Sequence, residues 1–295
     1  MNLVSVILPT CDRPDLLPRA LRSVLKQSGV ALEVLLVDSN RTTGPVLKNP
    51  ALADMLDDPR VKLIVPDPHP ANASQARNAG LDAAQGAWIS YLDDDDAYLP
   101  GKLARQLECA ERSGVDLVIC GYEVVMRRRR RVRQCHQDEY RGDACLVGAD
   151  YPTPVMFHRA DPAVRFETTA VAAQDHLFAI TFLARRGELR VACVPEKLLV
   201  MHTHEGPRVN SGNRLAVWHE YRFCVQCHGH LFSREARRAF LATGLLARAQ
   251  ALEVSWPEYI RCLRRIGATQ GWGSWRLVVN AIARRSSWLS RWVVT

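Results

Sequence analysis

Four consecutive carboxylates stand in the stretch YLDDDDAYLP, residues 91–100, directly after two residues typical of the end of a buried strand. Carboxylates side by side repel one another and resist ionising together. A solvated acidic turn is one explanation, because aspartate is favourable near a helix N-terminus. A divalent cation is the second, since Mg²⁺ and Mn²⁺ take oxygen ligands. Acid–base chemistry on a bound substrate is the third.

The segments around this cluster alternate between short apolar runs and helical patterns. Runs typical of buried strands are LVSVILP (3–9), EVLLVD (33–38), VKLIV (61–65), AWISYL (87–92) and DLVICGYEVVM (116–126). Helical patterns cover 14–27, 72–86 and 100–113. Strands that alternate with helices predict an α/β fold, with a mostly parallel, Rossmann-like sheet covered by helices on both faces.

Acidic residues follow three of the predicted strands. Asp12 comes just after the first strand, Asp38 ends the second, and the run 93–96 follows the fourth. Ligands of open α/β sheets bind outside the carboxyl ends of the strands. We therefore expect these carboxylates to meet at one edge of the sheet.

The organisation changes near residues 205–212, which have turn composition. We predict an α/β domain over 1–205 and a basic, Trp/Arg-rich helical extension over 206–295. Residues 233–295 hold eleven arginines against three acidic residues, an excess that equals the net charge of +8 of the whole chain. Four tryptophans stand in the last part of this segment, within residues 271–294: Trp272, Trp275, Trp288 and Trp292. This mixture suits a helix on an anionic membrane surface, or a helix packed on the domain or a second subunit.

Composition limits the location and the partners of the protein. The 295 residues are 47% hydrophobic, with no apolar run of about eighteen residues and no signal-like start. We therefore expect a cytoplasmic protein, either free or peripheral on the inner face of the cell membrane. No nucleic-acid motif is present, and we expect no nucleic-acid partner. The nine cysteines are expected to be mostly free thiols. In CVQCH (224–228), helical spacing favours packing over zinc or haem binding.

The arginine run RRRRR, residues 127–131, directly follows a predicted strand. We expect it to lie at the tip of a hairpin or on an edge strand. It is either a solvated loop or a contact for an anionic acceptor or membrane.

Several stretches together resemble the inverting family 2 glycosyltransferases with the GT-A fold. VSVILPTCDRPDLLPRALRSVLKQ resembles their opening strand, loop and helix, and ASQARNAGLDAAQGAWISYLDDDDAYLPGKL resembles the helix that leads into the Asp-x-Asp motif. QDHLFAITFLARRG resembles the helix of the catalytic base, and VMHTH the strand that closes the domain. The resemblance covers about residues 3–204.

The resemblance implies a role for individual residues. Asp175 would be the general base, and Asp95 with His202 would hold the metal, with His204 as the alternative histidine. Asp96 is left without a clear role. The residues implied on the donor side are Pro9, Thr10, Asp12, Arg13, Asp38, Arg77, Asp93 and Asp94.

The implied function is transfer of a sugar from a nucleoside diphosphate to a hydroxyl of a glycan or lipid-linked acceptor, in cell-surface polysaccharide synthesis. A Mn²⁺ or Mg²⁺ cofactor would stabilise the leaving diphosphate, and a carboxylate would take the acceptor's proton. UDP is the expected nucleotide, although Ser39 replaces an acid that the family often has. A nucleotidyltransferase is one alternative, but PTCDRPD lacks the glycines of a triphosphate loop. A non-catalytic binding module is the other.

Overall fold

The strands of the protein assemble into one sheet in the computed structural model, which describes residues 2–40, 46, 48–127, 129–169, 174–203 and 214–249 and the single positions 257 and 261. The described strands are β1 (Leu3–Thr10), β2 (Ala31–Asp38), β3 (Val61–Ile64), β4 (Trp88–Tyr91), β5 (Ala97–Tyr98), β6 (Leu117–Met126), β7 (Arg129–Arg133), β8 (Glu139–Arg141), β9 (Phe157–Arg159) and β10 (Arg190–His202). The described helices are α1 (Leu17–Leu25), α3 (Ala53–Leu56), α4 (Ala73–Ala83), α5 (Lys102–Ser113), α6 (Asp143–Val147), α7 (Gln174–Arg186), α8 (Arg214–His228) and α9 (Arg234–Ala249), with short 3-10 turns η1 (Pro50–Leu52), η2 (Thr153–Val155) and η3 (Gly229–Leu231).

The sheet is mostly parallel, as the sequence predicts. Its order is β3-β2-β1-β4-β9-β6-β10-β5, with β7 added to β6 and β8 to β10. The first four strands of this order are parallel, β9 runs antiparallel between β4 and β6, and β10 is parallel to β6. Buried apolar residues run without interruption along much of β2, because a central parallel strand is covered on both faces.

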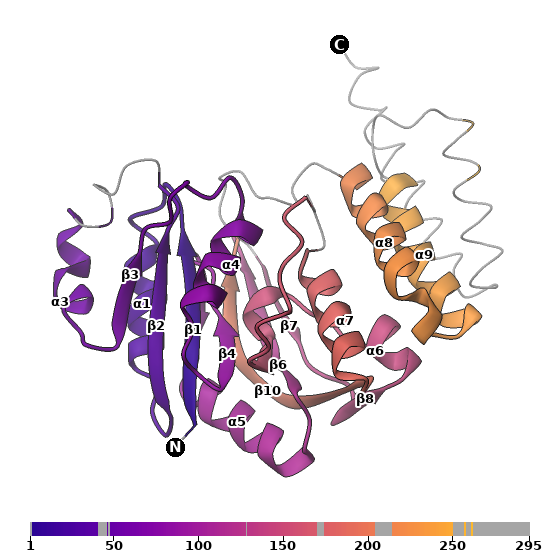
Figure 1. Ribbon diagram of the computed structural model, residues 1–295, viewed down its shortest axis with the longest axis horizontal. Helices are drawn as coiled ribbons and strands as arrows, with labels where there is room; N and C mark the ends of the chain where they lie inside the picture. Colours follow the sequence, from indigo (N-terminus) through magenta and orange to yellow (C-terminus); the bar gives the residue numbers. More distant parts are fainter. Residues whose placement is uncertain are drawn as a thin grey trace.

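Helices cover both faces of the sheet (Figure 1). Side chains of β4 show this, because successive residues of a strand point to opposite faces. Ser90 lies 3.3 Å from the amino group of Lys102 on α5, whereas the Tyr91 ring lies 6.1 Å from the Phe178 ring on α7. Helix α4 approaches β1 closely: a Cβ on Gly80 would lie 2.5 Å from a methyl carbon of Ile7.

The described part of the C-terminal extension packs on the sheet domain through aromatic contacts. Phe240 of α9 stacks on Tyr221 of α8 with ring centroids 4.3 Å apart, and it lies 4.8 Å from His176 at the start of α7. Helices α8 and α9 lie beside α7 and α6 (Figure 1). The boundary near residue 205 and the tryptophan-rich segment fall outside the described residues. None of the described helices is both long enough and apolar enough to cross a membrane.

Two of the nine cysteines form a disulfide that sequence reasoning did not identify. Cys135, which follows β7, is bonded to Cys193 on β10, with Cα atoms 6.3 Å apart. The other described cysteines are free thiols, as expected: Cys11, Cys109, Cys120, Cys145, Cys224 and Cys227. Cys224 belongs to the hydrophobic core, which agrees with the packing interpretation of CVQCH.

Candidate active site

A cleft of about 420 Å³ opens at the carboxyl ends of the strands, a size typical of small-molecule sites. It is lined by the ends of β1, β2 and β10, the turn after β4, the η2 turn and the start of α7. Most of the residues proposed from the sequence line it: Pro9, Thr10, Arg13, Arg77, Asp93, Asp94, Asp95, Asp175 and His202. Asp12 and Asp38 do not line it. Segments far apart in the sequence therefore meet here, as the strand-end argument predicts.

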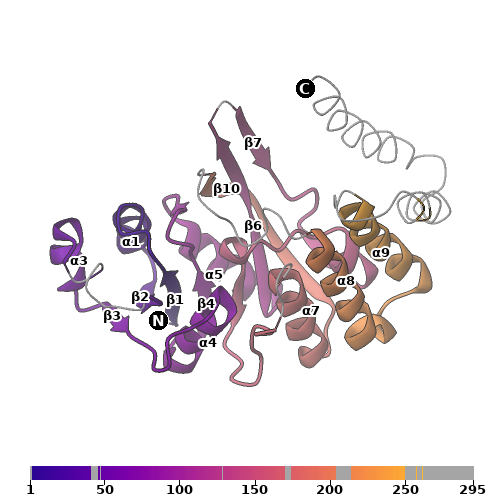
Figure 2. The same ribbon diagram turned by 90° about the horizontal axis from the view of Figure 1, so that it is seen from above.

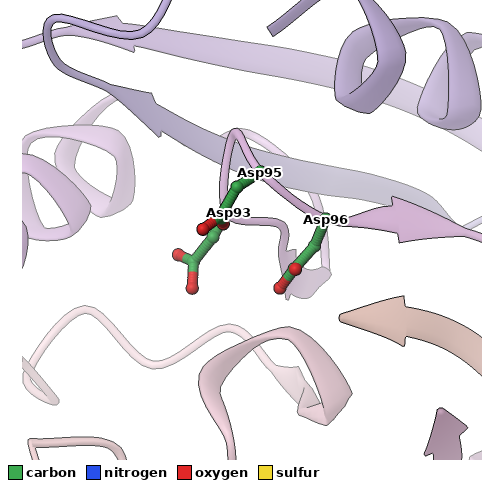
Figure 3. A group of neighbouring side chains, drawn as sticks. All are labelled: Asp93, Asp95 and Asp96. Atoms are coloured by element: carbon green, nitrogen blue, oxygen red, sulfur yellow. The ribbon is translucent and has the colours of Figure 1, made fainter. Parts of the chain in front are cut away.

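The acidic turn presents a compact group of carboxylates. Oxygen atoms of Asp93, Asp95 and Asp96 lie within 4.8 Å of one another. Figure 3 shows the three side chains projecting from the single turn that follows β4. Magnesium ions bind oxygen ligands at about 2.0–2.1 Å, so oxygens this close can share one ion. This donor set fits a Mg²⁺ or Mn²⁺ ion, and it brings in Asp96, which the resemblance left without a role.

Arginines offset much of the repulsion in this turn. Nη2 of Arg77 lies 2.7 Å from Oδ1 of Asp93. Nη1 of Arg13 lies 3.2 Å from Oδ2 of Asp95 and 3.3 Å from Oδ1 of Asp94. The sequence suggested a cation as the relief of this repulsion, whereas the structure supplies two guanidinium groups as well.

Two of the four aspartates point inward and fix the turn. The Thr10 hydroxyl donates to Oδ2 of Asp94 at 2.9 Å, which ties the turn to the end of β1. The backbone N–H of His202 donates to Oδ1 of Asp96 at 2.9 Å, which ties the turn to β10. Burial raises the pKa of Asp94 to about 6, although Arg13 and Thr10 oppose the shift. Burial also raises the pKa of Asp96, and the charges of Asp93 and Asp95 add to this effect.

Asp175 lies in the first turn of α7 and faces the same cleft. Burial raises its pKa to about 6, and the backbone N–H of His176, which donates to its Oδ1 at 2.9 Å, opposes the rise. A carboxylate with this pKa is still ionised at neutral pH, and it is more basic than an ordinary aspartate. Both properties suit a general base.

Two buried polar atoms at the end of β2 have no hydrogen-bond partner among the described residues. Oδ1 of Asp38 accepts hydrogen bonds from the side chain and the backbone of Asn40 at 2.6 and 2.9 Å. Oδ2 of Asp38 and the hydroxyl of Ser39 are buried without a hydrogen-bond partner among the described residues. Such atoms cost about 1–3 kcal/mol each unless a ligand or water supplies the partner. Of these two residues Ser39 lines the cleft, so its hydroxyl is placed to bond a polar ligand there.

Asn40 is a residue that sequence reasoning missed. Its Oδ1 accepts from the backbone N–H of Asp12 at 2.5 Å, and it holds Asp38 at the same time. Asp12 has a φ of 54°, a left-handed conformation that this hydrogen bond stabilises. The available signal was a polar residue two positions beyond a strand end, where asparagine commonly bonds the local backbone.

Of the two histidines expected near the metal, the structure describes His202. His202 lies in the cleft, next to the acidic turn, whereas His204 lies outside the described residues. Within the described ranges, the group of side chains able to hold a metal ion is the aspartate triad, and the CVQCH stretch forms no such group. The metal interpretation therefore rests on the acidic turn.

Two curated bacterial proteins are similar to parts of this chain. The succinoglycan biosynthesis protein ExoO of Rhizobium meliloti is 29% identical over 220 residues, which cover 69% of this chain and 61% of that protein. The GalNAc(5)-diNAcBac-PP-undecaprenol beta-1,3-glucosyltransferase of Campylobacter jejuni is 34% identical over 112 residues, 37% of this chain and 35% of that enzyme. The chain therefore spans less than two thirds of the length of these relatives.

The fold and the family follow from two further matches. The crystal structure of S. aureus TarS 1-349 in complex with UDP-GlcNAc superimposes with a TM-score of 0.69 over 96% of this chain and 88% of that one, at 17% identity, which shows a shared GT-A fold. The model of the family described as Glycosyl transferase family 2 matches residues 5–173, more than half of the chain. The chain thus belongs to glycosyl transferase family 2, the family that its motifs resemble.

Proposed function

We propose that this protein is an inverting glycosyltransferase that moves a sugar from a UDP-linked donor to a hydroxyl group of a lipid-linked glycan acceptor. The observation that carries the proposal is the position of the aspartate triad and of Asp175 in one cleft, which Arg13 and Arg77 also line. TarS, which shares the fold, has been crystallised with UDP-GlcNAc, and the relative from C. jejuni is named for an acceptor linked to PP-undecaprenol. Polysaccharide biosynthesis is the proposed setting, because ExoO is named for it.

Each part of the cleft has a task in this reaction. Ser39 offers a buried hydroxyl to the nucleotide, Asp38 supports this end of the cleft from behind, and the family resemblance puts Asp93 on the ribose side. A Mn²⁺ or Mg²⁺ ion, when bound by the triad, supplies Lewis-acid stabilisation of the leaving diphosphate. Asp175 accepts the proton of the acceptor hydroxyl while that oxygen attacks the anomeric carbon. A single displacement of this kind inverts the anomeric centre.

Two other functions explain less of the site. A nucleotidyltransferase needs a glycine-rich loop after the first strand to hold a triphosphate, and residues 9–15 contain no glycine. A non-catalytic binding module would have no use for a partly buried carboxylate with a raised pKa, which Asp175 has.

Donor binding tests the proposal. Purified protein is titrated calorimetrically with UDP, GDP and dTDP, each with and without Mn²⁺. We expect metal-dependent binding of UDP that is at least tenfold weaker in Asp95→Ala, because the metal loses one of its carboxylates. Asp54→Ala, which removes an exposed aspartate on α3, is the control and should bind UDP as the wild type does. Failure of all three nucleotides to bind a folded protein would refute the proposal.

A further inference from the structure

The arginine run, predicted at a hairpin tip or on an edge strand, forms part of the edge strand β7. Strand β7 pairs antiparallel with β6, and among the described strands it pairs with no other. All five of its residues are exposed. Seen from above in Figure 2, the β6–β7 hairpin projects from the body of the molecule.

The register places three of these arginines on the cleft face of the hairpin. Arg133, Arg131 and Arg129 stand opposite Tyr122, Val124 and Met126. Directly opposite residues of an antiparallel pair share one face of the sheet. Val124 lines the cleft, so the three arginines lie on the face that leads into it. We call Arg129, Arg131 and Arg133 the arginine strip.

Contacts of Tyr122 connect the strip to the base side of the cleft. The Tyr122 hydroxyl donates to Oδ2 of Asp150 at 2.5 Å. Burial raises the pKa of Tyr122, and the charges of Asp150 and Asp175 raise it further. The nearby charge of Arg133 opposes the rise. One end of the strip is therefore close to the part of the cleft that holds the base, which is where an acceptor must lie.

The two faces of the hairpin differ in charge. On the opposite face, Arg130 lies 3.8 Å from Glu123, which also pairs with Lys197 at 2.9 Å. Within the described part of the chain, no ion pair is formed by the arginine strip. Its side chains leave the backbone about every 7 Å, which is the rise of two strand residues. Exposed, uncompensated guanidinium groups at this spacing favour an extended anionic group.

We propose that the arginine strip binds the diphosphate of a lipid-linked acceptor, which the proposed function requires on this side of the cleft. Guanidinium groups bind phosphate oxygens through paired hydrogen bonds, and their positive charge remains at any physiological pH. The strip holds the diphosphate outside the cleft, so that the sugar attached to it reaches Asp175. The inference rests on the proposed function, but it concerns the acceptor and not the donor.

Binding of a short lipid diphosphate tests the inference. The probe is farnesyl diphosphate, added to protein already saturated with UDP and Mn²⁺, so that the donor site cannot capture the probe. The variant carries Arg129→Gln, Arg131→Gln and Arg133→Gln. The control carries Arg105→Gln, Arg130→Gln and Arg141→Gln, which remove the same charge from exposed arginines away from the strip face.

We expect the strip variant to bind farnesyl diphosphate about 10–100-fold more weakly than the wild type, since hydrogen bonds to charged groups are among the strong ones. The control should stay within about twofold of the wild type, and farnesol should not bind. Equal binding by the strip variant and the wild type would overturn the inference, as would equal binding of farnesol. If both variants bound farnesyl diphosphate equally weakly, and the wild type bound phosphatidylglycerol vesicles as strongly as the probe, the arginines would be assigned to a membrane surface. That result would also overturn the inference.

Unchanged UDP binding by the strip variant shows that it is folded and that the donor site is intact. If the wild type itself did not bind UDP, the proposed function would fail instead. The two failures are therefore distinguishable.

Discussion

Replacement of Asp175 by asparagine should make the enzyme much less active and the protein more stable. The side chain lies in the first turn of α7, and burial holds its pKa at about 6 instead of 3.8. Asparagine keeps the oxygen that accepts from the His176 N–H but cannot take a proton from an acceptor hydroxyl. Loss of a general base lowers the rate by about 10²–10⁴-fold.

The gain in stability follows from the shift in pKa. A rise from 3.8 to about 6 corresponds to about 3 kcal/mol, and we expect about 1–3 kcal/mol because the side chain is only partly buried. Between these two pH values the folded state binds more protons than the unfolded state. The stability of the wild type therefore falls as the pH rises through this window, and the ionised carboxylate is unfavourable above it. The asparagine variant lacks this penalty.

Urea denaturation at pH values from 3.5 to 8 measures the effect, together with the pH profile of kcat/KM. The difference in unfolding free energy between Asp175→Asn and the wild type should grow from pH 4 to pH 6 and then level off. The wild-type kcat/KM should fall by about tenfold from its plateau to pH 5. Asp54→Asn, in the first turn of α3, controls for the interaction of an aspartate with a helix N-terminus. A stability difference that does not change with pH, or a variant that retains a tenth of the activity, would refute the reasoning.

Two further predictions concern the scaffold. Gly80→Ala should lower the free energy of unfolding, measured by urea denaturation, by about 1–3 kcal/mol, because its Cβ would lie 2.5 Å from a methyl carbon of the buried Ile7. This cost outweighs the better helix propensity of alanine. A variant as stable as the wild type would show that α4 can move away from β1. Burial opposes ionisation of Glu33, but hydrogen bonds from Lys62, Ser5 and the Gln85 backbone lower its pKa below 4.5. Its contribution is therefore present above pH 4.5 and lost as the pH falls through the lowered value. Glu33→Gln should cost about 1 kcal/mol at pH 7 and less below pH 4, and a cost independent of pH would contradict this account.

The fold could be predicted from the sequence because its elements have strong local signals. The runs at 3–9 and 33–38 are apolar over their full length, which is what a strand covered on both faces requires, and they became β1 and β2. The antiparallel strand β9 was not predicted. It has three residues, FHR, and its place between β4 and β6 depends on pairing that no local pattern encodes.

The sequence predicted which residues belong to the site better than it predicted the contacts between them. The strand-end argument brought Asp93 and Asp95 to one edge, and the family resemblance added Asp175. The pairing of Arg77 with Asp93 was missed, because it joins a helix to a turn sixteen positions away through side-chain geometry. The disulfide between Cys135 and Cys193, 58 residues apart, was missed for the same reason.

The four aspartates of the acidic turn are identical in sequence and differ in task. Asp93 and Asp95 are partly exposed to the cleft, whereas Asp94 and Asp96 are buried. The buried pair accepts hydrogen bonds from Thr10 and from the backbone of His202, so it joins the turn to β1 and to β10, which come from distant parts of the chain. A turn anchored at two strands loses little freedom when it closes on an ion, and a smaller loss of entropy means tighter binding. The repetition of aspartate thus serves two purposes in one turn: Asp93 and Asp95 offer carboxylates to a cation, Asp94 anchors the turn, and Asp96 does both.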